Sequence, residues 1–142
     1  MANKVIFFLA NAGLLVSLYL LWTYVSGSPI VCSSSGCDAV RASSYSHLFG
    51  VPQPAFGVIF YILIIILSLL VAVWRYFPEN KIKVAILIVS LLGFAYSVYL
   101  TYLEAFVIHG FCDWCVVSAI ISALIFAVSA VGIFYGKIFK FR

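Results

Sequence analysis

The stretch AFGVIFYILIIILSLLVAVW, residues 55–74, decides the fold, because it carries no charged side chain. At a rise of about 1.5 Å per residue, a helix of about 20 residues crosses the roughly 30 Å hydrocarbon core of a bilayer. The stretch lacks the alternation of a barrel strand, and a helix satisfies its own backbone hydrogen bonds inside lipid. We therefore predict a transmembrane helix at residues 55–74.

Three further apolar runs, at residues 5–25, 84–108 and 116–135, have a similar length. Of all residues, 66% are hydrophobic and 8% charged, whereas an average soluble domain is roughly 25% charged. The first run is too long for the core of a signal peptide, and no small-residue cleavage site follows it, so we expect it to be retained. The prediction is one domain over residues 1–142, an all-α membrane protein built as a four-transmembrane-helix bundle in the lipid bilayer.

The basic side chains predict the orientation of the bundle. All except Arg41 lie near the two termini or in the loop at 75–83; they are Lys4, Arg75, Lys81, Lys83, Lys137, Lys140 and Arg142. The positive-inside rule then places both termini and that loop in the cytoplasm, and the loop at 26–54 and the turn at 110–115 on the extracytoplasmic side. The net charge of +4 is scattered over short segments, which argues against nucleic-acid binding.

All four cysteines lie in the segments predicted to be extracytoplasmic. Cys32 and Cys37 occur in the first outer loop within VCSSSGCD, and Cys112 and Cys115 form CDWC before the fourth run. Disulfides persist in such compartments. The C-x-x-C spacing lets one thiol attack and the other resolve, and the start of a helix stabilises a thiolate. Redox catalysis is the leading interpretation, while structural disulfides and a four-thiolate zinc site remain alternatives.

Three stretches resemble the vitamin K epoxide reductase family, in its prokaryotic disulfide-forming branch. They are CSSSGCDAVRASS at 32–44, FGVPQPAFG at 49–57 and YLTYLEAFVIHGFCDWC at 99–115. The specific feature is the order of the cysteines, with a loop pair first and C-x-x-C before the last helix. The disulfide-forming enzyme B family ranks second, because its C-x-x-C lies in the first outer loop.

The resemblance implies a bundle that encloses a quinone at its outer end, capped by a short amphipathic helix in the first extracytoplasmic loop. We expect this helix at about residues 38–48, with Asp38 capping its N-terminus. The implied function is a quinone-linked thiol oxidoreductase, which oxidises an extracytoplasmic thioredoxin-like partner and reduces a menaquinone, ubiquinone or vitamin K-type quinone. Residues 1–142 contain no recognisable thioredoxin-like domain, so we expect the partner to be a separate protein.

The resemblance also assigns a step to each cysteine. Cys32 would be exposed and exchange with the partner protein. Cys37 would bridge to Cys112 during electron transfer, and Cys115 would react with the quinone. Two other functions stay open: a vitamin K quinone or epoxide reductase, and a non-catalytic four-helix membrane protein with structural disulfides.

Three further residues are predicted to contact the quinone. Ser43 and Gln53 fall where the family keeps polar residues near the quinone head, and Gln53 stands at the position of an asparagine that hydrogen-bonds the quinone carbonyl. Phe111 is predicted from its position beside Cys112. Ala119 replaces a tyrosine of vertebrate members, which argues against epoxide reduction and leaves quinone reduction unaffected.

Two acidic residues lie close to the C-x-x-C. Glu104 falls inside the third apolar run, where it could relay protons to the reduced quinone or extend to the membrane interface; the sequence favours the interface. Asp113 stands where the family often has proline. A carboxylate beside two thiols disfavours the thiolate, so we predict that Asp113 makes the Cys112–Cys115 pair a better electron donor.

Overall fold

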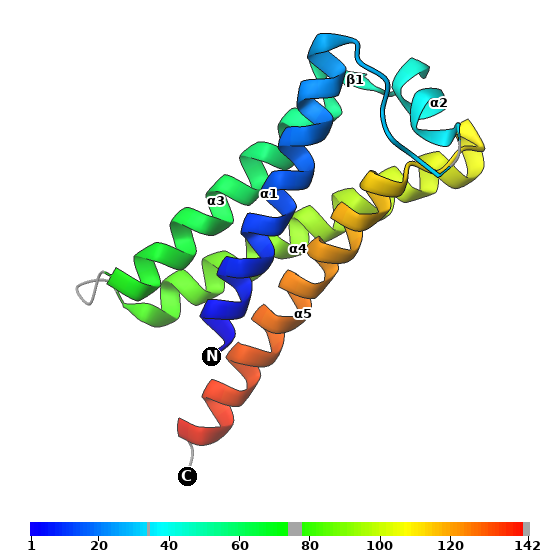
Figure 1. The fold of residues 1–142 in the computed structure, drawn as a ribbon. Coiled ribbons are helices and arrows are strands. Elements are labelled where there is room, and N and C mark those ends of the chain that lie inside the picture. Colours follow the sequence, from blue (N-terminus) through cyan, green and yellow to red (C-terminus); the bar gives the residue numbers. More distant parts are fainter. Residues whose placement is uncertain (34, 74–77, 141–142) are drawn as a thin grey trace.

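A computed structural model describes residues 1–33, 35–73 and 78–140, with the side chains of residues 137–140 left out. Within these residues, four long helices form a bundle (Figure 1). They are α1 (Ala2–Ser26), α3 (Gln53–Val73), α4 (Glu79–Leu103) and α5 (Asp113–Lys140). All four are long and apolar enough to cross a membrane, so the chain is an all-α membrane protein. Trp74, at the end of the predicted second span, lies outside the described residues.

The four helices close into a ring, in which α1 packs on α3 and α5, and α4 packs on the same two helices. Small residues allow the close approach. A Cβ added at Gly13 of α1 would overlap the ring of Tyr61 in α3, and one at Gly93 of α4 would overlap the ring of Phe60. Glycine at a helix crossing lets the facing side chain pack against the backbone, which is common between membrane helices.

Large apolar side chains lie both inside the bundle and on its outer surface. The buried core includes Ile6, Ala10, Tyr61, Ile64, Ile82, Ile86, Ile121 and Ile125. Large apolar side chains are also exposed around the bundle, among them Phe8, Leu15, Trp22, Ile59, Leu92 and Phe134. An exposed apolar surface of this extent suits contact with lipid rather than water.

A short connection covers one end of the bundle between α1 and α3. It contains the helix α2 (Gly36–Ala42) and a two-stranded antiparallel hairpin, β1 (His47–Leu48) and β2 (Val51–Pro52). The hairpin turns at Phe49 and Gly50, which both have positive φ, the geometry of a tight two-residue turn. Figure 1 shows α2 and the hairpin at the end opposite the two chain termini.

The predicted cap helix at 38–48 is corrected in its bounds and its cap. The N-cap of α2 is Ser35, and Asp38 lies in the first turn of the helix, where it forms an ion pair with Arg41. The helix ends at Ala42 because Ser43 adopts an extended conformation and its hydroxyl donates to the carbonyl of Val40. The last two residues of the predicted helix belong to strand β1.

The third membrane helix ends in an unusual turn. After Leu103, α4 continues as one π-helical turn, η1 (Glu104–Ile108), which ends at His109 with φ 54°. The backbone N–H of Gly110 donates to the carbonyl of Glu104 over 3.1 Å, and α5 starts at Asp113. The chain therefore reverses direction within a few residues and places the C-x-x-C at the start of α5.

Candidate active site

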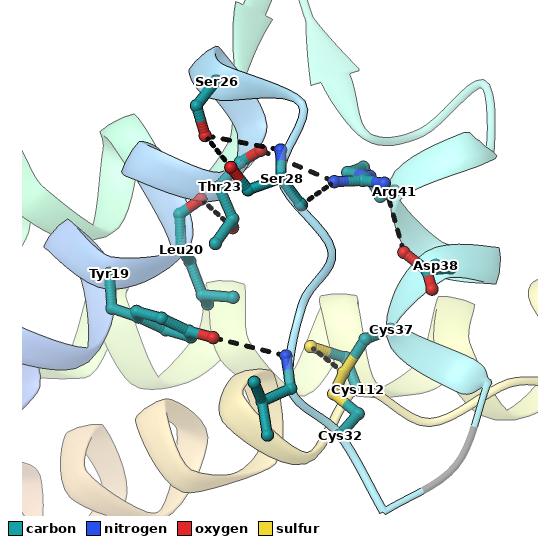
Figure 2. Close-up of polar contacts among 11 residues, drawn as sticks. Tyr19, Leu20, Thr23, Ser26, Ser28, Cys32, Cys37, Asp38, Arg41 and Cys112 are labelled. Carbon is teal, nitrogen blue, oxygen red and sulfur yellow. Dashed lines mark hydrogen bonds and ion pairs between the residues drawn. A yellow bond between two sulfur atoms is a disulfide. The ribbon is translucent and has the colours of Figure 1, made fainter.

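Cys32 and Cys37 form a disulfide at the α2 end of the bundle (Figure 2). Cys37 lies in the first turn of α2 and is fully buried, whereas Cys32 is half-buried. The first turn of α2 lies directly against the turn that precedes Cys112, because a Cβ added at Gly36 would overlap the backbone carbonyl of Phe111. Glycine at this position thus brings the loop pair up to the C-x-x-C.

Three hydrogen bonds hold residues 31–33 against α1 and the start of α5. The Val31 N–H donates to the hydroxyl of Tyr19 over 3.3 Å, and the Val31 carbonyl accepts from Nε1 of Trp114 over 2.7 Å. The Ser33 N–H donates to Oδ2 of Asp113 over 2.8 Å. Two of the three partners belong to the CDWC motif, so the two cysteine segments form one unit.

Arg41 joins α2 to the end of α1. Its Nη1 donates to the carbonyl of Ser28 over 2.6 Å and to that of Thr23 over 3.5 Å, while Nη2 pairs with Asp38 at 3.2 Å (Figure 2). The guanidinium therefore satisfies one carbonyl in the last turn of α1 and one just after the helix, where a positive charge is favourable. This contact fixes the helix that carries Cys37.

The sulfur of Cys112 lies 3.4 Å from the sulfur of Cys37, and both residues are buried. A hydrogen bond with the Cys115 side chain is the main cause that lowers the pKa of the Cys112 thiol, and backbone N–H groups of Cys115 and Trp114 add to it; burial and the Glu104 carboxylate act in the opposite direction. A lowered pKa makes Cys112 a better leaving thiolate in thiol–disulfide exchange. Cys112 is thus placed to exchange with Cys37.

A cavity of about 130 Å³ lies inside the bundle next to the C-x-x-C. This is roughly ten times the 10–15 Å³ that one water molecule needs on the same basis. Its walls come from α1, α3, α4, η1 and α5, with Val40 of α2 and the residues after α2 on the covered side. The apolar and aromatic part of the wall includes Leu20, Phe56, Phe60, Leu100, Leu103 and Ala119, and Cys115 is the cysteine of the wall. Most of the cavity surface is apolar, although hydroxyl, amide and carboxyl groups also line it, and such a cavity suits a small, largely apolar ligand with polar atoms.

Gln53 and Tyr96 form a polar pair in this wall. The Tyr96 hydroxyl donates to Oε1 of Gln53, and Nε2 of Gln53 donates to the carbonyl of Tyr45 over 2.9 Å. Ser43 also lines the cavity, although its hydroxyl donates to a carbonyl of α2. Ser43, Gln53 and Cys115, which the sequence predicted as quinone contacts, are therefore brought together around one cavity.

Phe111 is not brought to the cavity. Its side chain is 52% exposed, and it is absent from the described residues that line the cavity wall. Between the end of η1 and the start of α5 the backbone turns sharply, so that Cys112 is buried while its neighbour Phe111 faces outward. The prediction that Phe111 contacts the quinone because it precedes Cys112 is therefore not supported by its position.

Two polar residues of the cavity wall differ from the sequence-based expectation: Glu104, for which the membrane interface was favoured over proton relay, and Tyr96, for which no role was expected. Glu104 is 4% exposed and lines the cavity, and its Oε2 accepts the N–H of Cys112 over 3.4 Å. The predicted position at the interface is therefore wrong. An ionisable side chain within an apolar membrane segment usually faces the interior of the bundle, because its exposure to lipid costs free energy, and this was the signal in the sequence. No comparable signal distinguishes Tyr96 from the other tyrosines of α4.

A sequence model of the vitamin K epoxide reductase family matches residues 4–130. The chain belongs to the vitamin K epoxide reductase family. The matched residues contain all four cysteines and the whole of the cavity wall. Membership of the vitamin K epoxide reductase family implies a multi-pass membrane oxidoreductase whose general activity links thiols to a quinone. The two cysteine pairs and the adjacent cavity are the parts that such chemistry needs.

The effect of Asp113 can be tested through the reduction potential of the Cys112–Cys115 pair. We expect Asp113→Ala to make this potential more positive, because the carboxylate that disfavours the two thiolates is removed. Asp38→Ala is the matched control, because Asp38 contacts Arg41 and lies in α2. Equilibration with thiol–disulfide redox buffers measures both potentials, and equal values for Asp113→Ala and the unmodified protein contradict the assignment.

Proposed function

We propose that this protein oxidises the dithiol of an extracytoplasmic thioredoxin-like protein, passes the electrons through its two cysteine pairs, and reduces a membrane quinone. The product is a disulfide in the partner, so the protein supports disulfide bond formation. One observation carries the proposal: Cys37 lies 3.4 Å from Cys112 on one side, and Cys115 lies in the wall of an apolar cavity on the other.

The first step of the proposal is exchange between the partner and the loop pair. A partner thiolate attacks Sγ of Cys32, which is the less buried sulfur of the disulfide, and Cys37 leaves as a thiolate. The second partner thiol then resolves the mixed disulfide. The partner leaves oxidised, and Cys32 and Cys37 are left reduced.

The second step moves the two electrons to the C-x-x-C. The Cys37 thiolate attacks Sγ of Cys112 in a Cys112–Cys115 disulfide and releases Cys115, after which Cys32 attacks Cys37 and releases Cys112. The product of this step has a Cys32–Cys37 disulfide and free thiols at Cys112 and Cys115, which is the pairing in the described structure. The short Cys37–Cys112 distance supports this transfer.

The third step takes place at the cavity. A quinone supplies a two-electron, two-proton acceptor, and a menaquinone, ubiquinone or vitamin K-type ring fits the apolar and aromatic wall. Cys115 would present its sulfur to the ring, and the second Nε2 hydrogen of Gln53, whose oxygen accepts from Tyr96, would donate to a ring oxygen. Burial of the site excludes water while the Cys112–Cys115 disulfide forms.

Charge at the opposite end of the bundle supports an extracytoplasmic location for the cysteines. Lys4 lies at the start of α1, and Lys81 and Lys83 lie at the start of α4, so these three cations are at the end remote from α2 (Figure 1). The positive-inside rule assigns that end to the cytoplasm. Arg75 and Arg142, and the side chains of Lys137 and Lys140, lie outside the described part.

The proposal is tested with the purified protein in anaerobic liposomes. A reduced thioredoxin-like protein is added outside, and its thiols are counted over time with and without menaquinone or ubiquinone in the membrane. Catalytic thiol oxidation is expected only in the presence of quinone. Turnover in quinone-free liposomes, or no turnover with either quinone, contradicts the proposal. Vitamin K epoxide is included as a third acceptor. It is expected to be inactive, because Ala119 in the cavity wall lacks the hydroxyl of the tyrosine that vertebrate members carry at this position.

A further inference from the structure

Of the four acidic residues in the chain, Glu104 is the one that is buried. It lies inside a membrane-spanning segment, where an ionisable side chain is costly and usually serves a function. The transfers between sulfur atoms described above do not use it. A buried carboxyl group beside the cavity therefore needs a separate explanation.

The π-helical turn η1 holds this carboxyl group at the C-x-x-C. Glu104 is the first residue of η1, and its carbonyl accepts the N–H of Gly110 over 3.1 Å. Its side chain lines the cavity, its Oε2 accepts the N–H of Cys112 over 3.4 Å, and Cys115 lines the same cavity. Single π-helical turns inside longer helices are frequent at functional sites.

The groups that face Glu104 can donate a proton, but none of them carries a positive charge that would neutralise a carboxylate. They are the thiols of Cys112 and Cys115 and, from α1, the hydroxyl of Tyr24. Within the described residues, the ion pairs of the chain join Arg41 to Asp38 and Lys83 to Glu79. Glu104 and Cys115 line the same cavity, Oε2 of Glu104 accepts the N–H of Cys112, and the N–H of Cys115 donates to the sulfur of Cys112 over 3.4 Å, so the carboxyl group and the two thiols form one cluster.

We propose that Glu104 is a catalytic residue of the quinone step, which accepts the proton of the Cys115 thiol and delivers it to a quinone oxygen. This inference rests on the function proposed above. The S–H bond of Cys115 breaks, its proton moves to an oxygen of the Glu104 carboxylate, and an S–S bond forms between Cys112 and Cys115. The two electrons released reduce the quinone. One proton reaches the quinone from Glu104, a second comes from water, and the Cys112 proton has already left to water.

The test replaces Glu104 by an amide of the same shape. Fully reduced protein is mixed anaerobically with quinone, and the rate of a single turnover is followed by the quinone absorbance. A general acid or base typically contributes about 10²–10⁴-fold, so we expect Glu104→Gln to slow this step by about 100-fold or more. Glu79→Gln is the matched control at the other end of the same membrane segment, beside Lys83, and is expected to keep the unmodified rate.

A second measurement separates proton transfer from a role in holding Cys112. In a Cys32→Ser, Cys115→Ser background without quinone, oxidised glutathione converts the Cys37 and Cys112 thiols into a trapped disulfide and is itself reduced to two glutathione thiols. We expect Glu104→Gln to change the rate of this reaction by less than about threefold. If Glu104→Gln slows formation of the Cys37–Cys112 disulfide as much as it slows quinone reduction, Glu104 only positions Cys112, and the inference is overturned.

A third measurement observes the carboxyl group directly in quinone-free protein. We expect the infrared difference spectrum between the reduced and oxidised Cys112–Cys115 pair to contain a carboxylic C=O band, which disappears in Glu104→Gln and persists in Glu79→Gln. An unchanged band in Glu104→Gln, or an unmodified single-turnover rate, overturns the inference but leaves the proposed function standing. If the protein with all residues intact fails to reduce quinone, both fail.

Discussion

Replacement of Cys115 by serine is expected to abolish quinone reduction, with a loss of at least about 10³-fold. Among the described residues that form the cavity wall, Cys115 is the cysteine, and the other three sulfurs lie outside that wall. A hydroxyl in its place can neither supply the electrons nor form the disulfide with Cys112, because only a thiolate undergoes this exchange. The single-turnover reaction of reduced protein with quinone measures the effect.

The same Cys115→Ser variant provides its own control for folding. The loop pair is independent of Cys115, so the Cys32–Cys37 disulfide should still form and should still accept electrons once from a reduced partner. A variant that oxidises one equivalent of partner and no more is the expected result. Continued turnover with quinone would show that Cys112 or a loop cysteine reaches the acceptor without Cys115.

Replacement of Cys37 by serine is expected to reduce oxidation of the partner protein to the background rate. The Cys37 sulfur lies 3.4 Å from that of Cys112 and is buried against it, whereas Cys32 lies in the more accessible segment before α2. Without Cys37, electrons that enter at Cys32 have no sulfur through which to reach the C-x-x-C. The rate of partner oxidation in quinone-containing liposomes measures the loss.

Two comparisons sharpen the Cys37→Ser experiment. The pre-reduced C-x-x-C pair of this variant should still reduce quinone in a single turnover, because Cys112 and Cys115 are intact. In the companion variant Cys32→Ser, the disulfide between Cys37 and Cys112 should accumulate, since no thiol remains in the loop to resolve it. Partner oxidation by Cys37→Ser at the original rate contradicts the relay, because it requires direct exchange between the partner and the C-x-x-C.

The apolar runs predicted the four membrane helices because length and absence of charge are properties of the chain alone. The ends of the helices depend on contacts that composition does not reveal. Thus α5 starts at Asp113 rather than Val116, because the last three residues of the C-x-x-C belong to its first turn. In the same way, α4 starts at Glu79 rather than Val84, where an exposed Glu79–Lys83 pair continues the helix beyond the apolar run.

The connection between α1 and α3 was harder to predict than the helices. A helix in this loop was expected, but its cap and its end were wrong. Asp38 is drawn into an ion pair with Arg41, which itself binds the carbonyls at the end of α1. The contact of Arg41 with the end of α1 joins segments that are separate in sequence, so it cannot be predicted from residues 38–48 alone.

The cysteines were easier to place than the rest of the site. Two pairs in two outer segments predict a common end of the bundle, whereas the side chains that line a cavity depend on how helices rotate about their axes. That rotation turns Tyr96 inward to meet Gln53. The π-helical turn directs Glu104 to the interior, and the tight turn after it leaves Phe111 exposed.

The central claim is that all four thiols deliver their electrons to a quinone through Cys115. The most direct measurement is the number of quinols formed per fully reduced chain in the absence of oxygen. Four thiols release four electrons when they form two disulfides, and each quinone takes up two electrons. We therefore expect two quinols for the unmodified protein, one for Cys37→Ser and none for Cys115→Ser. A single quinol from the unmodified protein, or any quinol from Cys115→Ser, contradicts the central claim.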